Sequence, residues 1–298
     1  MGHLSRILQG TCPAGSARAD VAIIHSLMTR PRVLLLGTGG AANEGRRQAC
    51  LLVERADRGL PPILLDTGSG LDVVRALIAS NVDPIRVQDV FVSHRHADHA
   101  GGLDPLLLWR RLRIQRAGRT LGDVPVRVYA EPRVIEAFGR LLEATASGTL
   151  AAYGDALQWQ RLVDGKPVPL PGGGQLVPFL VDHAPADGGA LGCVVEVDGV
   201  RIAYSGDTRP CDRLIEAVRG VDVLFHEAGG LDRDADEIHR HAHSTAGDAG
   251  RAARDAGVGR LYLTHLPDDT LAAALLAEAT AAFGGPVGLA ADMGSVDL

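Results

Sequence analysis

Four side chains of the types that bind metal ions in proteins lie within six positions of one another. They occur in the segment Ser93-His94-Arg95-His96-Ala97-Asp98-His99. Neutral imidazoles and carboxylates converge where a divalent cation replaces the hydration that they lose on burial. A polar turn with scattered histidines explains this density less well. The spacing therefore predicts a metal site that includes His94, His96, Asp98 and His99.

The metal-binding segment follows the apolar run Val90-Phe91-Val92, whose β-branched and aromatic residues are typical of a buried strand. The cluster thus falls where a strand ends and a loop begins, which is where sites lie in α/β proteins. Three more residues follow apolar runs in the same way, namely His183, Asp207 and His265. We expect them to meet the first four at one edge of the fold.

Seven protein ligands suffice for two cations. A three-imidazole site would consist of His94, His96 and His183. A second site would consist of Asp98, His99 and His265, with Asp207 bridging the two. These nitrogen and oxygen ligands suit two Zn²⁺ ions, with Mn²⁺, Fe or Ni²⁺ as substitutes. Two such ions, about 4 Å apart, activate a shared water as hydroxide, so the predicted chemistry is hydrolysis.

The composition limits the class of protein. The chain has 298 residues, of which 46% are hydrophobic, and a formal net charge of −6. It can bury a sizeable core, and it has no global positive field to attract nucleic acid. The four cysteines show no C-x-x-C spacing, which favours reduced thiols and a cytoplasmic location. No run of about eighteen apolar residues occurs, so we expect no membrane span.

The chain divides into a short extension and one domain. Residues 1–30 have no clear hydrophobic period and are predicted to be a loosely ordered N-terminal extension. Residues 31–298 are predicted to form a single domain of two βα-rich halves, joined by loops over residues 145–174, where Gly and Pro are frequent. Two strand-rich halves flanked by helices indicate an α/β fold, a four-layer αββα sandwich.

The apolar spacing from Leu103 to Ile114 predicts an amphipathic helix. Its exposed face would carry Arg110, Arg111, Arg113, Arg116 and Arg119. A solvated helix face is favoured over a phosphate-binding lip. The run Leu106-Leu107-Leu108-Trp109 could supply part of an interface in a homodimer.

The order of the ligands resembles that of the metallo-β-lactamase fold superfamily: His94-x-His96-x-Asp98-His99, then His183, Asp207 and His265. Finer motifs are Leu36-Gly37-Thr38-Gly39-Gly40-Ala41, Tyr204-Ser205-Gly206-Asp207-Thr208-Arg209-Pro210, Phe225-His226-Glu227-Ala228 and His243-Ser244-Thr245. Together they are similar to the branch that contains ribonuclease Z, related phosphodiesterases and zinc-dependent arylsulfatases. The resemblance spans about residues 32–290. It is specific for fold and metal site and much less so for substrate.

The resemblance also implies roles for residues outside the ligand set. Asp98 would orient or deprotonate the nucleophilic water. His243 would donate a proton to the leaving group, with Glu227 setting its orientation; a leaving alkoxide needs such an acid. The nearby His239 and His241 are interpreted as surface residues, and His226 as a structural or supporting residue.

Two departures from the family pattern bear on the substrate. Bacterial ribonuclease Z inserts a long tRNA-clamping arm between the third ligand motif and the bridging Asp, whereas only 24 positions separate His183 from Asp207 here. The family's Glu-Ala-Thr is also altered, to Glu227-Ala228-Gly229. We therefore expect a metal-dependent hydrolase of a small or cyclic nucleotide-type phosphodiester, and nucleic acid is not the favoured partner.

Other functions remain open at this point. The enzyme alternatives are an arylsulfatase, a ribonuclease Z-like tRNA 3′ endonuclease, and a lactone or β-lactam hydrolase. A metal-binding sensor module is the alternative outside the enzymes.

Overall fold

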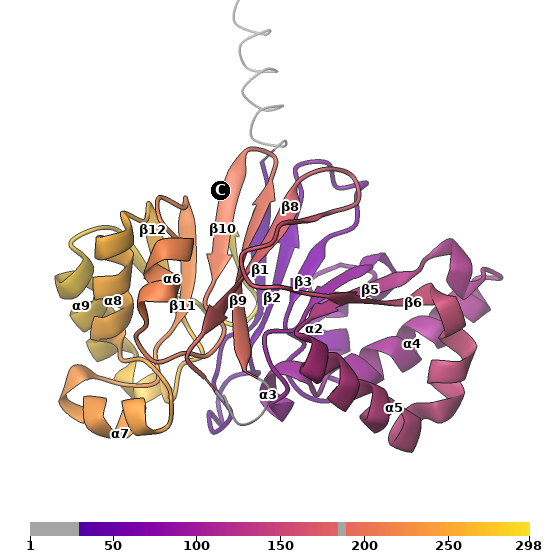
Figure 1. The fold of residues 1–298 in the computed structure, drawn as a ribbon, viewed down its shortest axis with the longest axis horizontal. Helices are drawn as coiled ribbons and strands as arrows, with labels where there is room; N and C mark the ends of the chain where they lie inside the picture. Colours follow the sequence, from indigo (N-terminus) through magenta and orange to yellow (C-terminus); the bar gives the residue numbers. More distant parts are fainter. Residues whose placement is uncertain (1–29, 184–188) are drawn as a thin grey trace, which may run out of the picture.

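The computed structural model describes residues 30–183 and 189–298. Within these residues, two seven-stranded sheets face each other, and helices cover the outer face of each (Figure 1). This arrangement confirms the predicted αββα sandwich. Of the predicted N-terminal extension, all but Arg30 lies outside the described residues.

The first sheet has the strand order β14-β1-β2-β3-β4-β5-β6. Its strands are β1 (Arg32–Gly37), β2 (Cys50–Glu54), β3 (Ile63–Leu65), β4 (Asp89–Phe91), β5 (Val126–Ala130), β6 (Leu157–Arg161) and β14 (Gly294–Asp297). The pairs from β3 to β6 are parallel and therefore need crossover connections. The helices of these crossovers are α2 (Asp72–Ala79), α4 (Leu103–Arg116) and α5 (Pro132–Tyr153).

The second sheet has the order β13-β12-β11-β10-β9-β8-β7. Its strands are β7 (Val168–Pro169), β8 (Gln175–Val181), β9 (Ala190–Val197), β10 (Val200–Tyr204), β11 (Val223–Glu227), β12 (Arg260–Thr264) and β13 (Val287–Leu289). Parallel pairing begins at β10. The helices of this half are α6 (Asp212–Ala217), α7 (Ala235–Arg240), α8 (Ala246–Ala256) and α9 (Ala272–Phe283).

Strand side chains alternate between two cores. In β1, Val33 and Leu35 belong to the core between the sheets. Leu34 and Leu36 belong to the core between the first sheet and its helices. Because both faces are covered, the strands read as continuous apolar runs rather than as alternating ones.

The prediction of loops over residues 145–174 is wrong for its first part. Helix α5 continues to Tyr153, although Ala146 has a non-helical φ of −137°, and β6 follows. The hydroxyl of Tyr153 donates to the carbonyl of Leu107 at 3.1 Å, and Leu142 packs in the core beneath α5. Packing against α4 therefore extends the helix past the glycine at position 148.

The exposed arginine face predicted for α4 is wrong at Arg110, which is fully buried. Its guanidinium donates to the carbonyls of Pro84 (2.8 Å) and Val124 (3.0 Å). Buried backbone carbonyls need a hydrogen-bond donor, and Arg110 supplies one to a carbonyl in each of two loops.

In the apolar run Leu106-Leu107-Leu108-Trp109 only Leu108 is strongly exposed, at 43%. The homodimer stays a prediction. Among the described residues, no helix is long and apolar enough to cross a membrane.

Candidate metal centre

The seven predicted ligands come from strand ends of both sheets. In the first sheet, β4 leads to His94, to His96 at the N-cap of the short helix α3 (Ala97–Ala100), and to Asp98 and His99 within that helix. In the second sheet, β8, β10 and β12 lead to the other three ligands, His183, Asp207 and His265. These strand ends meet at the edge of the sandwich where α3 lies (Figure 1).

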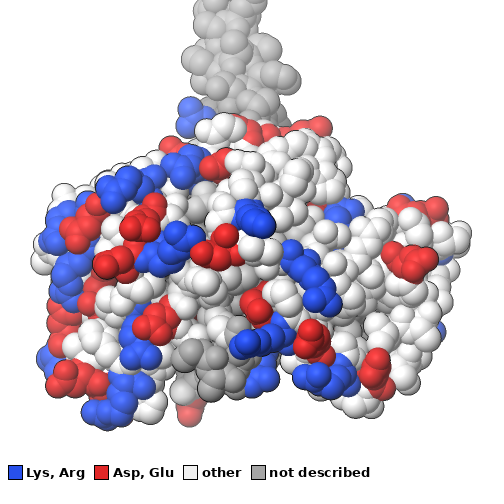
Figure 2. All heavy atoms as spheres, viewed as in Figure 1, with Lys and Arg blue, Asp and Glu red and all other residues white. Residues whose placement is uncertain are grey.

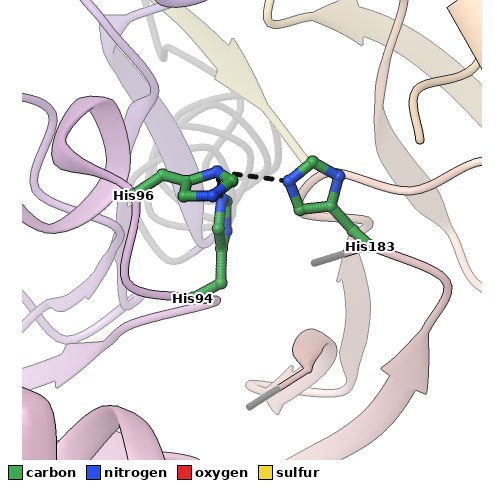
Figure 3. Close-up of side chains that lie close together, drawn as sticks. All are labelled: His94, His96 and His183. Atoms are coloured by element: carbon green, nitrogen blue, oxygen red, sulfur yellow. Dashed lines mark hydrogen bonds between the residues drawn. The ribbon is translucent and has the colours of Figure 1, made fainter. Parts of the chain in front are cut away.

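Three imidazoles form the first cluster. Nε2 of His94 lies 2.9 Å from Nδ1 of His96, and Nε2 of His183 lies 3.3 Å from the same atom. Figure 3 shows the rings of His94 and His96 on one side and that of His183 facing them from the other. One nitrogen from each ring lies within 4.8 Å of the others, so the group could hold one cation.

The second cluster combines two carboxylates with two imidazoles. Nε2 of His265 lies 3.3 Å from Oδ2 of Asp98 and 3.5 Å from Oδ1 of Asp207. Nε2 of His99 lies 3.1 Å from Oδ2 of Asp207. These four residues could hold a second cation.

Asp207 reaches both clusters. Its Oδ2 lies 3.8 Å from Nε2 of His94 and 3.9 Å from Nε2 of His183, in addition to its contacts with the second cluster. Among the described residues, Oδ1 of Asp207 and Nε2 of His99 are buried and have no hydrogen-bond partner. The large majority of buried polar atoms in native proteins have a hydrogen-bond partner or bind an ion or water. A divalent cation would satisfy both, so the donor set fits bound metal.

Two histidines of the first cluster, His94 and His183, have the protonation state that cation binding requires. Nδ1 of His183 donates to the carbonyl of Ala242 at 2.8 Å, which leaves the lone pair on Nε2. Burial lowers the pKa of His183 and holds that of His94 well below its usual range. Both rings are therefore neutral at pH 7, as metal binding requires.

Asp66 supports both clusters, and its role was missed in the sequence. Its buried carboxylate, at the end of β3, accepts hydrogen bonds from Nδ1 of His99 (2.8 Å) and from the hydroxyls of Ser93 (2.7 Å) and Tyr204 (2.8 Å). The Ser93 oxygen lies 3.0 Å from Nδ1 of His94, from which it accepts a hydrogen bond. One carboxylate thus orients a histidine in each cluster. Its position directly after a strand was the available sequence signal.

His243 and Glu227 lie beside the clusters. Nδ1 of His243 is 3.0 Å from Oε2 of Glu227, which is fully buried at the end of β11. The His243 ring centroid lies 5.0 Å from that of His183 and 5.5 Å from that of His265. Burial lowers the pKa of His243, but the Glu227 carboxylate outweighs it and raises the pKa to about 9. His243 is therefore protonated at pH 7, with Nε2 left to donate.

The remaining histidines near this segment differ in environment. His226 is buried, and its Nδ1 donates to the carbonyl of Glu227 at 2.8 Å. His241 is exposed, as predicted. His239 is not a loose surface residue, because its Nε2 donates to Asp248 at 2.7 Å and its side chain is only 35% exposed. Asp248, the carboxylate that caps helix α8, holds the His239 ring by this hydrogen bond, which explains why His239 is less exposed than predicted.

A cavity of about 270 Å³ opens onto the clusters. It is lined by Gly40, Ala41, Ala42, His96, Asp98, Asp207, Gly229, His243, His265 and Pro267. No Lys or Arg is among the described residues that line it. A larger cavity of about 660 Å³, lined by residues that include Pro31, Val200 and Arg260, lies at the opposite ends of β10 and β12 and contains none of the predicted ligands.

Charge on the surface is mixed rather than gathered. On the face in view in Figure 2, basic and acidic side chains are interspersed, most densely over the half that contains α6, α8 and α9. This face presents no continuous basic surface of the kind that follows a nucleic acid backbone.

The αββα fold and the His- and Asp-rich strand ends define the metallo-β-lactamase class of proteins. Residues 62–266 match the family described as Beta-lactamase superfamily domain, and the chain belongs to this family. It is thus a member of a superfamily of metal-dependent hydrolases.

Similar proteins extend over most of the chain. The uncharacterised protein Rv1339 of Mycobacterium tuberculosis is 34% identical over 266 residues, which are 88% of this chain and 90% of that protein. Ribonuclease Z of Metallosphaera sedula is 29% identical over 273 residues, with 79% of this chain and 88% of that protein covered. The crystal structure of the metallo-beta-lactamase fold protein YhfI from Bacillus subtilis has a TM-score of 0.76 at 22% identity and covers 90% of this chain and 100% of that one.

Proposed function

We propose that this chain is a two-metal phosphodiester hydrolase that acts on a small or cyclic nucleotide-type ester. The proposed zinc ligands are His94, His96, Asp98, His99, His183, Asp207 and His265. The observation that carries the proposal is the pair of His243 and Glu227, which sets an imidazole bonded to a carboxylate beside both ligand clusters. Such an imidazole suits a reaction that must protonate a leaving oxygen.

In the proposed reaction, the two cations and the side chains of Asp98, His243 and Glu227 have separate roles. When bound, the two cations would supply a water acidic enough to act as hydroxide and would stabilise charge on the phosphoryl oxygens. Asp98, whose side chain is 14% exposed, would accept the proton of the attacking water. The water oxygen bonds to phosphorus as the bond to the leaving oxygen breaks. His243 gives its Nε2 proton to that oxygen, and Glu227 holds the charged ring in place.

The cavity supports a small substrate with one phosphoryl charge. Its volume is about 270 Å³, and its described lining offers no Lys or Arg to a second phosphate. Nucleic acid binding draws its affinity largely from such contacts to several phosphates. The interval between His183 and Asp207 contains β9 and β10, which leaves no room there for a long tRNA-clamping arm.

A panel of substrates tests the proposal on protein of measured metal content. It compares bis-p-nitrophenyl phosphate, 2′,3′- and 3′,5′-cyclic nucleotides, p-nitrophenyl sulfate, a lactone and a pre-tRNA. We expect the cyclic nucleotides to give the highest kcat/KM. A higher value for the sulfate, the lactone or the pre-tRNA would replace the proposal with the corresponding alternative. Turnover of none of them would favour a sensor module.

The acid is tested by His243→Ala. Because general acid catalysis contributes about 10²- to 10⁴-fold, we expect kcat for a cyclic nucleotide to fall by that range. The metal content should stay at the wild-type value, since the predicted ligand set does not include His243. His241→Ala, an exposed histidine of the same segment, is the matched control and should retain full activity. Full retention of turnover in His243→Ala would remove the assignment.

A further inference from the structure

The turn of residues 40–43 forms the wall of the cavity beside the predicted ligand His265. Its first three residues line the cavity. The backbone N–H of Asn43 closes the turn by donating to the carbonyl of Gly40 at 3.1 Å. Gly40 lies against the His265 ring, since a Cβ atom at Gly40 would lie 3.0 Å from Cε1 of His265. The cavity wall and the predicted ligand are therefore in contact.

The backbone of His265 has a left-handed conformation. Its φ of 53° is uncommon for a residue other than glycine, and such a conformation persists where the surrounding structure fixes it. The N–H of the next residue, Leu266, donates to the carbonyl of Thr38 at 2.9 Å, and the carbonyl of Leu266 accepts from the N–H of Gly40 at 3.0 Å. The loop after β1 thus fixes the chain directly after the predicted ligand.

The side chain of Asn43 joins the cavity wall to the same residue. It is buried, with 7% of its surface exposed. Its Nδ2 donates to the carbonyl of Leu266 at 3.0 Å. Its Oδ1 accepts from the backbone N–H groups of Gly45 at 2.9 Å and of Arg46 at 3.0 Å. Because one end of the amide binds the loop and the other binds Leu266, this side chain holds the cavity wall against the segment that carries His265.

We propose that Asn43 is a positioning residue for the metal centre, which holds the His265 imidazole in the second cluster by fixing Leu266 and the cavity wall. A ligand that is fixed before the cation binds loses less conformational freedom on binding, so the affinity for the cation is higher. This inference rests on the ligand set of the proposed function. It deepens that function by naming a residue that acts on metal affinity without binding the metal.

Asn43→Asp isolates the hydrogen bond to Leu266. The new carboxylate can still accept from the N–H groups of Gly45 and Arg46, but it has no N–H to donate to the Leu266 carbonyl. We expect the affinity for zinc, measured by competition with a chromophoric chelator, to fall about 10-fold, which is the low end of the effect of residues that orient ligands. Asn43→Ala removes the same hydrogen bond without adding a charge and should lower the affinity at least as far. An unchanged zinc affinity in Asn43→Ala would overturn the proposal.

A double-mutant cycle shows whether Asn43 acts through His265. In the background of His265→Ala, Asn43→Ala should lower the zinc affinity no further, because the ligand that it positions is gone. In the background of His96→Ala, which changes the first cluster instead, the fall of about 10-fold should persist. An equal fall in both backgrounds would show a general loosening of the fold and would contradict a role through His265.

Asp83→Ala is the matched control for the loss of a loop hydrogen bond. The side chain of Asp83 accepts from the N–H of Ile85 at 3.0 Å in the loop before β4, whereas the predicted ligands come after that strand. This variant should lower the Tm of the metal-free protein and leave the zinc affinity unchanged. A fall in zinc affinity as large as that of Asn43→Ala would mean that affinity follows stability, against the proposal.

These affinities are measured without a substrate, which keeps the inference distinct from the proposed function. If the wild-type protein hydrolyses no phosphodiester, the proposed function fails, and the double-mutant cycle still decides whether Asn43 positions His265.

Discussion

The buried carboxylate of Asp66 connects to histidines of both clusters without being a predicted ligand. It accepts from Nδ1 of His99 directly and from Nδ1 of His94 through the hydroxyl of Ser93. Hydrogen bonds of this kind fix the tautomer and direction of a ligating imidazole. Asp66 should therefore act on metal affinity at both clusters at once.

Asp66→Asn should lower zinc affinity by about 10- to 100-fold, because an amide nitrogen cannot accept the hydrogen bonds that the carboxylate accepts. Competition with a chromophoric chelator measures this. Tyr204→Phe removes one donor to Asp66 but leaves both histidine connections, so its affinity should stay closer to wild type. An unchanged zinc affinity in Asp66→Asn would show that the histidines hold their orientation without it.

The ligand residues could be predicted because each lies in the segment that comes after an apolar strand, and chain order alone reveals that. The role of Asp66 could not, because it depends on Ser93, His99 and Tyr204 meeting around one carboxylate, and Tyr204 lies 138 positions away. Arg110 shows the same limit: a charged residue in a helical pattern is expected to be exposed, and only the loops above it turn it inward.

Helix α8 fixes the segment that carries His243. Its cap is formed by Thr245 and Asp248, each of which accepts from the backbone N–H of the other at 3.0 Å. Asp248 also accepts from His239 and Arg251, both at 2.7 Å. One carboxylate thus joins the helix start to the chain before it.

Asp248 should make stability depend on acid pH. Burial raises its pKa, but the hydrogen bonds from His239 and Arg251 outweigh this and lower the pKa to about 2. A carboxyl whose pKa is lower in the folded state stabilises that state above its unfolded pKa of about 3.9, and the stabilisation is lost as pH falls through about 2.

Asp248→Asn should therefore lose about 1–2 kcal/mol of unfolding free energy at pH 7, after allowance for solvent screening, and less near pH 2. Urea unfolding of metal-free protein at several pH values measures the difference. Asp255→Asn, an exposed carboxylate of the same helix, is the matched control. A difference that stays constant from pH 7 to pH 2 would rule out the ionised carboxylate as its source.

The two sheets of the whole molecule share one candidate metal centre. His94, His96, Asp98 and His99 follow the first sheet, and His183, Asp207 and His265 follow the second. Bound cations would join the two halves, and a ligand that binds only the folded state stabilises it by about 4 kcal/mol at a thousand times its Kd.

Removal of metal by a chelator should lower Tm by on the order of 10 °C in a protein of this size. Circular dichroism follows the transition, and added zinc should restore it. His265→Ala should bring the metal-loaded Tm close to that of the chelated wild type. A Tm that does not respond to chelation would mean that the halves hold together without the ions.

The layered fold could be predicted from the sequence, because short apolar runs typical of strands alternate along the chain with segments whose apolar residues have helical spacing. The end of the chain could not be assigned to a sheet in this way. Strand β14 crosses to the first sheet and pairs with β1, although it follows the helices of the second half. Such a pairing joins residues far apart in the chain, and neither local propensity nor periodicity carries information about it.

That pairing sets Arg32 opposite Asp297, so the first and last strands of the domain are neighbours. Both ends of the described domain lie at the edge of the sandwich opposite α3 (Figure 1). A segment or second domain fused at either end would therefore start on the side away from the cavity that opens onto the ligand clusters. In evolutionary terms, the fold can gain new partners by gene fusion at both termini while its metal edge stays open to substrate.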